Sequence, residues 1–141
     1  MSSVAELLAE ARSGIRRYEP TEALARAANG SVLVDLRSHD ERERDGIIPG
    51  SMHVPRSVLE WRVDEASGFS NPHVAQTELE LVLVCNEGYS SSFAASALRG
   101  LGFSHAADLA GGFQSWRTAG LPTMVAPPRV DGLPGMGGPD R

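Results

Sequence analysis

Two short segments consist almost entirely of apolar residues, and they are the clearest sign of regular structure in the chain. They span residues 31–36 and 80–85 and are rich in Val and Leu. Strands that are covered on both faces have this continuous apolar pattern, which is typical of parallel sheets between helices. Weaker strand patterns occur at residues 52–54 and 106–109. The sequence therefore predicts a parallel sheet that includes these segments.

Helical patterns alternate with the predicted strands. A helix is expected to begin after Ser3, which forms a capping box with Glu6, and to stop near Gly14. A second helix is expected from Pro20, because proline suits the first helical position, to Asn29. Apolar spacing predicts two more helices, over 91–99 and 113–118. This alternation predicts an α/β fold, an open parallel sheet with helices on both faces.

Composition divides the 141 residues into three parts, of which only one is long enough to be a domain. Residues 1–14 are the N-terminal helix, and residues 15–122 contain all the predicted strands. Pro and Gly recur throughout residues 123–141, and this composition offers few buried contacts. We therefore expect the tail to be flexible and to contribute little to stability.

Charge and cysteine content exclude several classes of function. The net charge of −5 and the pI of about 5.3 argue against nucleic acid and against an anionic membrane surface as partners. The chain has no apolar run of membrane-spanning length and no signal-peptide pattern, so a cytoplasmic location is expected. A single cysteine, Cys85, permits no internal disulfide and no Cys-rich metal site. The four histidines have no metal-ligand spacing.

Cys85 is the strongest candidate for chemistry, because it ends a predicted buried strand and precedes a Gly- and Ser-containing loop and a helix. Ligand sites in open α/β sheets lie at the carboxyl ends of strands. Such a loop directs backbone N–H groups toward one point, and the following helix adds a partial positive charge. A thiol held there should have a lowered pKa and act as a nucleophile. Simple packing of a buried cysteine is the alternative.

The chain resembles the rhodanese-like domains over residues 15–122. Several short motifs carry the resemblance, and their order and spacing make it specific. In chain order they are Val34-Asp35-Leu36-Arg37, Gly46 to Ser51 with Val54-Pro55, the loop Cys85 to Ser91, Ala94-Ala95, Leu101-Gly102-Phe103, Leu109, Gly111-Gly112 and Trp116.

The resemblance implies a sulfurtransferase that works without a metal or an organic cofactor. The loop cysteine of that family, here Cys85, takes a sulfane sulfur from a donor such as thiosulfate and carries it as a persulfide. A small acceptor, cyanide or a thiol, then removes the sulfur. The residues expected to bind the substrate are Asn86, Glu87, Gly88, Tyr89, Ser90 and Ser91 of the loop, together with Arg62. Nothing in the sequence indicates the oligomeric state.

Two positions depart from the family pattern. Ser90 stands where many thiosulfate-using rhodaneses have Arg, which offers an oxyanion a fork of donors where Ser offers one hydroxyl. This departure questions the preference for thiosulfate without removing the nucleophile. Arg62, on an expected helix near the loop, either replaces the missing Arg or lies on a solvated face. Ile47 replaces a histidine that is more often structural than catalytic.

Two other functions compete with sulfur transfer. Phosphatases with a loop cysteine generally carry an Arg in that loop, and here no Arg follows Cys85 before Arg99, which argues strongly against this class. A regulatory or redox-sensing module would keep the fold without turnover, and Ser90 leaves that alternative open. Asp35 and Arg37 are expected to form a salt bridge between strand and helix, and Glu87 is expected to face solvent.

Overall fold

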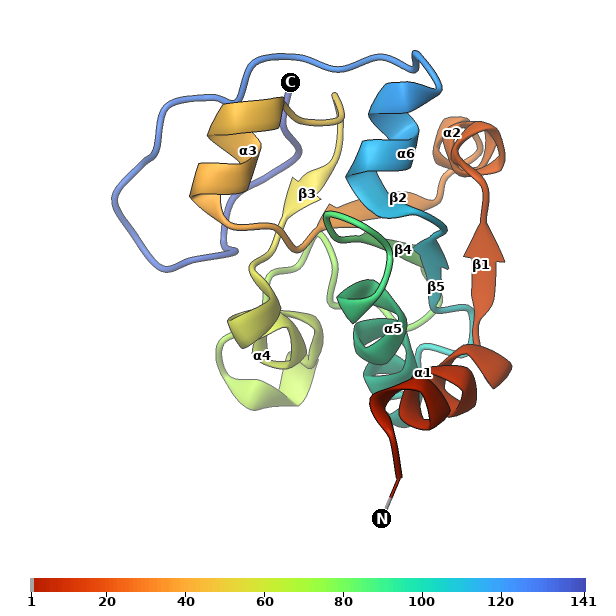
Figure 1. The fold of residues 1–141 in the computed structure, drawn as a ribbon. Helices are drawn as coiled ribbons and strands as arrows, with labels where there is room; N and C mark the ends of the chain where they lie inside the picture. The colour runs from red at the N-terminus through yellow and green to blue at the C-terminus, as the bar shows by residue number, and fades with distance from the viewer. Residues whose placement is uncertain (1) are drawn as a thin grey trace.

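A computed structural model describes residues 2–141 and contains one five-stranded sheet in the order β1-β5-β4-β2-β3 (Figure 1). Every pair of neighbouring strands is parallel. The strands are β1 (Arg16–Tyr18), β2 (Val32–Asp35), β3 (Met52–His53), β4 (Leu81–Val84) and β5 (Ala107–Leu109). The α/β class and the parallel sheet expected from the sequence are confirmed.

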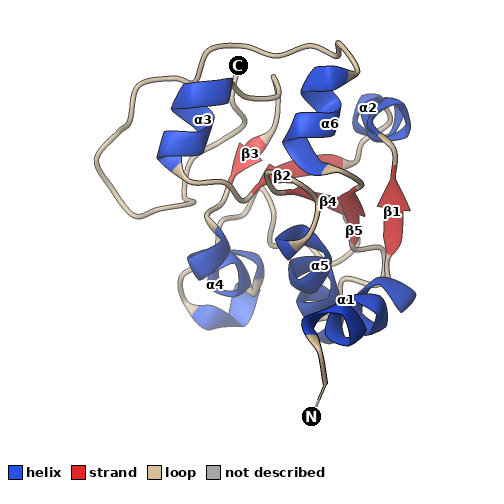
Figure 2. Ribbon diagram, viewed as in Figure 1, coloured by secondary structure: helices blue, strands red, loops and turns tan. Residues whose placement is uncertain are grey.

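Helices cover both faces of the sheet, as Figure 2 shows. One layer holds α1, α4 and α5, and the other holds α2, α3 and α6. The helices are α1 (Val4–Ser13), α2 (Pro20–Ala28), α3 (His39–Asp45), α4 (Leu59–Val63), α5 (Ser90–Gly100) and α6 (Gly112–Thr118), with 3₁₀ turns at Arg56–Val58 and Glu65–Ser67. Among residues 2–141, no helix has the length and apolar character needed to cross a bilayer.

Strand β4 lies in the middle of the sheet and explains the continuous apolar pattern. Leu81 and Leu83 pack into the core on the side of α5, whereas Val82 and Val84 pack on the side of α6. All four side chains are fully buried. Because alternate residues of a strand face opposite sides, every residue of β4 faces the core on one side or the other.

Helices α1 and α2 begin where the sequence predicts them, whereas the short strand β1 has no recognisable sequence pattern. Ser3 caps α1 by accepting from the Glu6 N–H at 3.1 Å, and Pro20 begins α2. Strand β1 was not predicted, because it has only three residues and two of them are arginines. Strand β1 forms because β5 provides a pairing edge at residues 107–109. An edge of this kind is tertiary information that a local pattern does not contain.

The tail is held against the domain beside α3 and β3 (Figure 1) by buried polar groups. Arg62 donates to the Pro134 carbonyl at 2.7 Å. The Asn71 amide donates to two further tail carbonyls at 2.8 and 2.9 Å. Arg42 forms an ion pair with Asp140. These contacts give residues 123–141 more fixed partners than their Pro- and Gly-rich composition indicates, and the flexibility of the segment stays a prediction.

Removal of residues 126–141 tests the contribution of the tail to stability. The truncation removes the tail groups that accept hydrogen bonds from Arg42, Arg62 and Asn71. We therefore expect Tm to fall by roughly 5–10 °C. The matched control is Arg129→Ala, which removes only exposed ion pairs with Asp40 and Glu43 and should leave Tm nearly unchanged. Equal Tm values for the full-length and truncated chains would show that the tail is dispensable.

Candidate active site

Cys85 follows β4 directly and lies at the carboxyl edge of the sheet, where the loop leads into α5. Its side chain is buried, with 6% of the residue exposed. The thiol sulfur accepts hydrogen bonds from the backbone N–H groups of Gly88 at 3.1 Å and Ser91 at 3.4 Å. The Ser91 hydroxyl lies 3.2 Å from the same sulfur. The loop therefore surrounds the sulfur with donors, as its sequence predicts.

Burial and hydrogen bonding have opposite effects on the ionisation of this thiol. Burial alone raises the pKa of Cys85, because it removes water from the charged form. The hydroxyls of Ser91 and Ser90 and the N–H groups of Ser91 and Gly88 lower it. The hydrogen bonds outweigh burial, so the pKa of Cys85 lies below its ordinary value. A larger fraction of the sulfur is consequently a thiolate at neutral pH, which is the nucleophilic form.

At Gly88 the loop lies close to the backbone at the start of α6. The Gly88 φ of +87° is in the left-handed region, and a Cβ there would lie 2.6 Å from the Gly111 nitrogen. The Gly88 carbonyl accepts hydrogen bonds from the guanidinium groups of Arg12 at 2.8 Å and Arg17 at 2.9 Å. Only glycine satisfies both the conformation and the spacing at this position.

The start of α6 fixes the other side of the loop. The Phe113 N–H donates to the Cys85 carbonyl at 2.8 Å, and the Gln114 N–H donates to the Asn86 carbonyl at 3.1 Å. The Gln114 side chain also donates to the Asn86 side chain at 2.9 Å. The active loop is thus held by β4, α5 and α6 together.

A hollow of about 330 Å³ opens beside the thiol. Its lining contains two carboxylates, those of Glu41 and Glu87, and one guanidinium, that of Arg37. The complete lining is Leu36, Arg37, Glu41, Cys85, Asn86, Glu87, Tyr89 and Ser90. Because Arg37 is 98% buried and paired with Asp35, an anion that enters this hollow meets no exposed guanidinium.

The loop residues expected from the sequence gather around Cys85, but Arg62 does not. Asn86, Glu87, Tyr89 and Ser90 line the hollow, whereas Gly88 and Ser91 contact the sulfur. Glu87 and Tyr89 are exposed. Arg62 is buried in α4 and donates to the carbonyls of Phe69 and Pro134, so it lies neither at the hollow nor on a solvated face.

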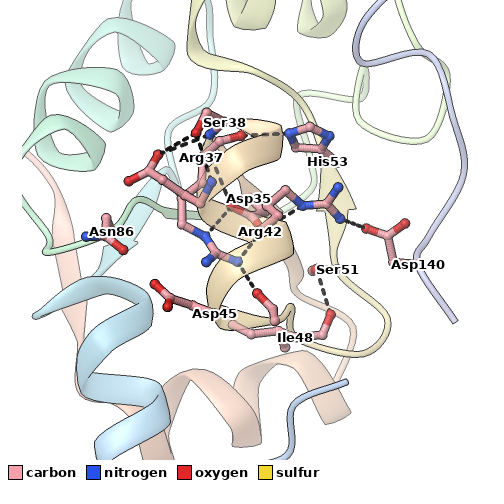
Figure 3. Close-up of polar contacts among 12 residues, drawn as sticks. Asp35, Arg37, Ser38, Arg42, Asp45, Ile48, Ser51, His53, Asn86 and Asp140 are labelled. Atoms are coloured by element: carbon pink, nitrogen blue, oxygen red, sulfur yellow. Dashed lines mark hydrogen bonds and ion pairs between the residues drawn. The ribbon is translucent and has the colours of Figure 1, made fainter. Parts of the chain in front are cut away.

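Asp35 joins the end of β2 to α3, as Figure 3 shows. Its carboxylate accepts from Arg37 at 2.9 Å and from Arg42 at 3.2 Å, and Asp140 of the tail pairs with the far side of Arg42. Arg42 of α3 makes the link between strand and helix, whereas Arg37 lies in the loop before α3. The expected salt bridge between Asp35 and Arg37 is also present. It places Arg37 beneath the hollow, where the guanidinium stacks 3.8 Å from the centre of the Phe113 ring.

A buried polar cluster beneath the loop was not predicted from the sequence. Asp108 of β5 is fully buried and accepts from the hydroxyls of Ser91 at 2.8 Å and Ser92 at 2.7 Å. Arg17 donates to the same carboxylate at 2.9 Å. One signal was visible in the sequence, because Asp108 is a lone acid within an otherwise apolar strand.

The rhodanese-like domain model matches residues 19–119 of the chain. Curated relatives include the thiosulfate sulfurtransferase GlpE of Pseudomonas syringae pv. syringae, 38% identical over 73% of this chain and 88% of its own length. GlpE of Ectopseudomonas mendocina is 33% identical over 81% of this chain and 94% of its own length. This chain is accordingly a sulfurtransferase, and its single buried cysteine fits the persulfide-carrying residue of such an enzyme.

Several solved structures share the fold of this chain. A Rhodopseudomonas palustris protein of unknown function, described as a possible tyrosine phosphatase, superposes with a TM-score of 0.82 at 34% identity and covers 88% of this chain and 96% of its own. The human single-domain sulfurtransferase TSTD1 gives a TM-score of 0.59 at 28% identity, over 74% of this chain and 96% of its own. On these matches and on the geometry of the cysteine loop, the chain belongs to the rhodanese-like domain family.

Proposed function

We propose that the chain moves a sulfane sulfur from thiosulfate, or a related small donor, to a thiol or to cyanide, through a persulfide on Cys85. One observation carries the proposal: the sulfur of Cys85 lies in a preformed set of donors at 3.1–3.4 Å. Such donors stabilise an anionic sulfur before and after transfer at no cost of reorganisation. The names of the relatives, which are thiosulfate sulfurtransferases, support the choice of donor.

The reaction needs two displacements at sulfur. The Cys85 thiolate attacks the sulfane sulfur of thiosulfate, a new S–S bond forms, and the old S–S bond breaks to release sulfite. The acceptor, as thiolate or cyanide, then attacks the outer sulfur of the persulfide and returns Cys85 to the thiolate. Both steps conserve charge and need no external oxidant or reductant. The lowered pKa of Cys85 favours the thiolate that begins and ends the cycle.

We assign this activity to residues 15–122, with α1 supporting the loop. The support is the hydrogen bond from Arg12 of α1 to the Gly88 carbonyl at 2.8 Å. We also place the activity in the cytoplasm, because that compartment keeps a lone thiol reduced and ready to accept sulfur.

Intact-mass spectrometry tests the proposal directly. The protein is incubated with thiosulfate, desalted and measured with and without cyanide. We expect a gain of one sulfur atom on Cys85 that cyanide removes as thiocyanate. A mass that stays unchanged with thiosulfate, a thiosulfonate and mercaptopyruvate would contradict the proposal and favour a regulatory module. Hydrolysis of p-nitrophenyl phosphate in its place would favour a phosphatase, which the lack of Arg between Cys85 and Arg99 argues against.

Ser90→Arg should raise the efficiency with thiosulfate. Ser90 lines the hollow, whose accessible charges are the carboxylates of Glu41 and Glu87, so a guanidinium there supplies the missing counter-charge for a dianion. A well-placed charged hydrogen bond contributes about 1.5–3 kcal/mol, and about 1.4 kcal/mol suffices for a tenfold rise in kcat/KM. Steady-state kinetics should show the change mainly in KM.

The matched control is Ser90→Gln, which adds a long polar side chain without charge. We expect this variant to leave the KM for thiosulfate unimproved. If Ser90→Arg and Ser90→Gln give equal KM values, charge at this position does not govern the use of thiosulfate.

A further inference from the structure

The Ser91 hydroxyl has one hydrogen atom and two acceptors within reach. Its oxygen lies 2.8 Å from Oδ2 of Asp108 and 3.2 Å from Sγ of Cys85. When the sulfur is a thiol, its S–H donates to Ser91, and the Ser91 O–H donates to Asp108. When the sulfur is an anion, both neighbours of the hydroxyl are acceptors and compete for its single proton. The carboxylate is the nearer of the two.

Asp108 is held firmly in this position. Its side chain is fully buried, and β5 lies beside β4, with Asp108 opposite Leu83 in the parallel register (Figure 1). Nε of Arg17 donates to Oδ1 at 2.9 Å, and the Ser92 hydroxyl donates to Oδ2 at 2.7 Å. These two bonds hold the carboxylate in place independently of Ser91.

We propose that Asp108 is a positioning residue for sulfur transfer, which acts on Cys85 through the Ser91 hydroxyl. This inference rests on the proposed function of Cys85. In the resting thiol, Asp108 withdraws the Ser91 proton from the sulfur and makes Ser91 an acceptor for the S–H. On ionisation, or in the anionic persulfide, the Ser91 hydroxyl turns from Asp108 to the sulfur, while Arg17 and Ser92 still satisfy the carboxylate.

The physical effect is a balance between ionisation and nucleophilicity. A hydrogen bond that favours the neutral thiol opposes its ionisation. Asp108 therefore offsets part of the lowering of the Cys85 pKa that the loop N–H groups cause. A thiolate of higher pKa is the stronger nucleophile, so this restraint benefits the attack on the donor. The other charged or titratable groups near the sulfur are the same in the wild type and in a variant of Asp108. They are Arg37, Glu41, Glu87 and Tyr89 at the hollow, and Arg12 and Arg17 at the Gly88 carbonyl.

Asp108→Asn tests the competition for the proton. The amide oxygen keeps the bond from Arg17, and the amide NH₂ then faces the oxygens of Ser91 and Ser92 and donates to them. The Ser91 hydroxyl is thereby free to donate to the sulfur. We expect the pKa of Cys85, measured by the pH dependence of iodoacetamide alkylation, to fall by roughly one unit. The acid limb of kcat/KM should move to lower pH by the same amount.

A double-mutant cycle separates this relay from a simple charge effect. In a Ser91→Ala background, Asp108→Asn should shift the Cys85 titration much less than in the wild type. The matched control is Glu80→Gln at the opposite end of β4, where a carboxylate also accepts from two hydroxyls, those of Tyr18 and Ser31. Glu80→Gln should leave the titration of Cys85 unchanged. Equal shifts from Asp108→Asn in the two backgrounds would overturn the proposal.

Two further measurements keep the test decisive. If Asp108→Asn does not fold, two variants of Ser91 take its place. We expect Ser91→Ala to raise the pKa of Cys85, and Ser91→Thr, which keeps the hydroxyl, to restore the wild-type value. Identical titrations of all three proteins would overturn the role of the hydroxyl and with it that of Asp108. Because alkylation does not require turnover, a wild type that forms no persulfide disproves the proposed function separately from this inference.

Discussion

Cys85→Ser is expected to abolish sulfur transfer, with a loss on the order of a thousandfold or more in kcat/KM. A serine hydroxyl at its ordinary pKa is almost wholly protonated at neutral pH, and its oxygen cannot carry the transferred sulfur as a persulfide. The substitution changes little in size, and the backbone donors of Gly88 and Ser91 can bond to oxygen as they do to sulfur. Thiocyanate formation measures the activity, and a thermal melt measures the fold.

Alkylation of the wild type provides the matched control. Cys85 is the single cysteine of the chain, so iodoacetamide should remove activity to the same extent as the serine substitution. Alkylated protein and Cys85→Ser should also show no gain of sulfur by mass. A serine variant with activity close to that of the wild type would contradict the assignment of the nucleophile.

Gly88→Ala is expected to have the second largest effect, on both stability and activity. The added Cβ would lie 2.6 Å from the Gly111 nitrogen and 3.1 Å from the Gly112 nitrogen, and these backbone atoms cannot move away without displacing α6. The φ of +87° adds strain of about 1–2 kcal/mol for any residue with a Cβ. We expect a loss of about 2–4 kcal/mol in the free energy of unfolding and at least a hundredfold in kcat/KM.

Gly50→Ala separates the effect of backbone strain from the effect of the steric clash. Gly50 has a similar φ of +83°, but nothing lies within 4 Å of a Cβ built there. We expect this variant to lose only the smaller, conformational part of the stability and to keep its activity. Urea denaturation measures the first quantity and the thiosulfate assay the second. If both variants lose equal stability and keep equal activity, the close approach of the loop to α6 contributes nothing to function.

The reactive loop was predictable because its signals are local. A buried strand, a glycine and a helix start follow one another within residues 80–92, and each is a property of a few neighbouring residues. The helix starts at Ser3 and Pro20 were predictable for the same reason. Resemblance to a known family then gave the chemistry of Cys85, which geometry alone would leave as a nucleophile without a substrate.

The roles of Arg62 and Asp108 depend on contacts between distant parts of the chain and could not be predicted. Arg62 has its partners at Phe69 and Pro134, and the second of these belongs to the tail, whose composition gives no sign of docking. Asp108 reaches Ser91 only because β5 pairs with β4. The lone acid in an apolar strand marks Asp108 as unusual, but nothing in the neighbouring sequence shows which distant residues it contacts.

The order of the strands also bears on the moment at which the cysteine becomes reactive. Cys85 leaves the ribosome before Asp108 and before Phe113, whose N–H holds the Cys85 carbonyl at 2.8 Å. The edge strand β1, made first, pairs with β5, which is made last of the five strands. Pairings between such distant segments form late, because the intervening loop must close first. The donor-surrounded form of Cys85 therefore depends on segments that follow it in the chain and on the pairing of β5.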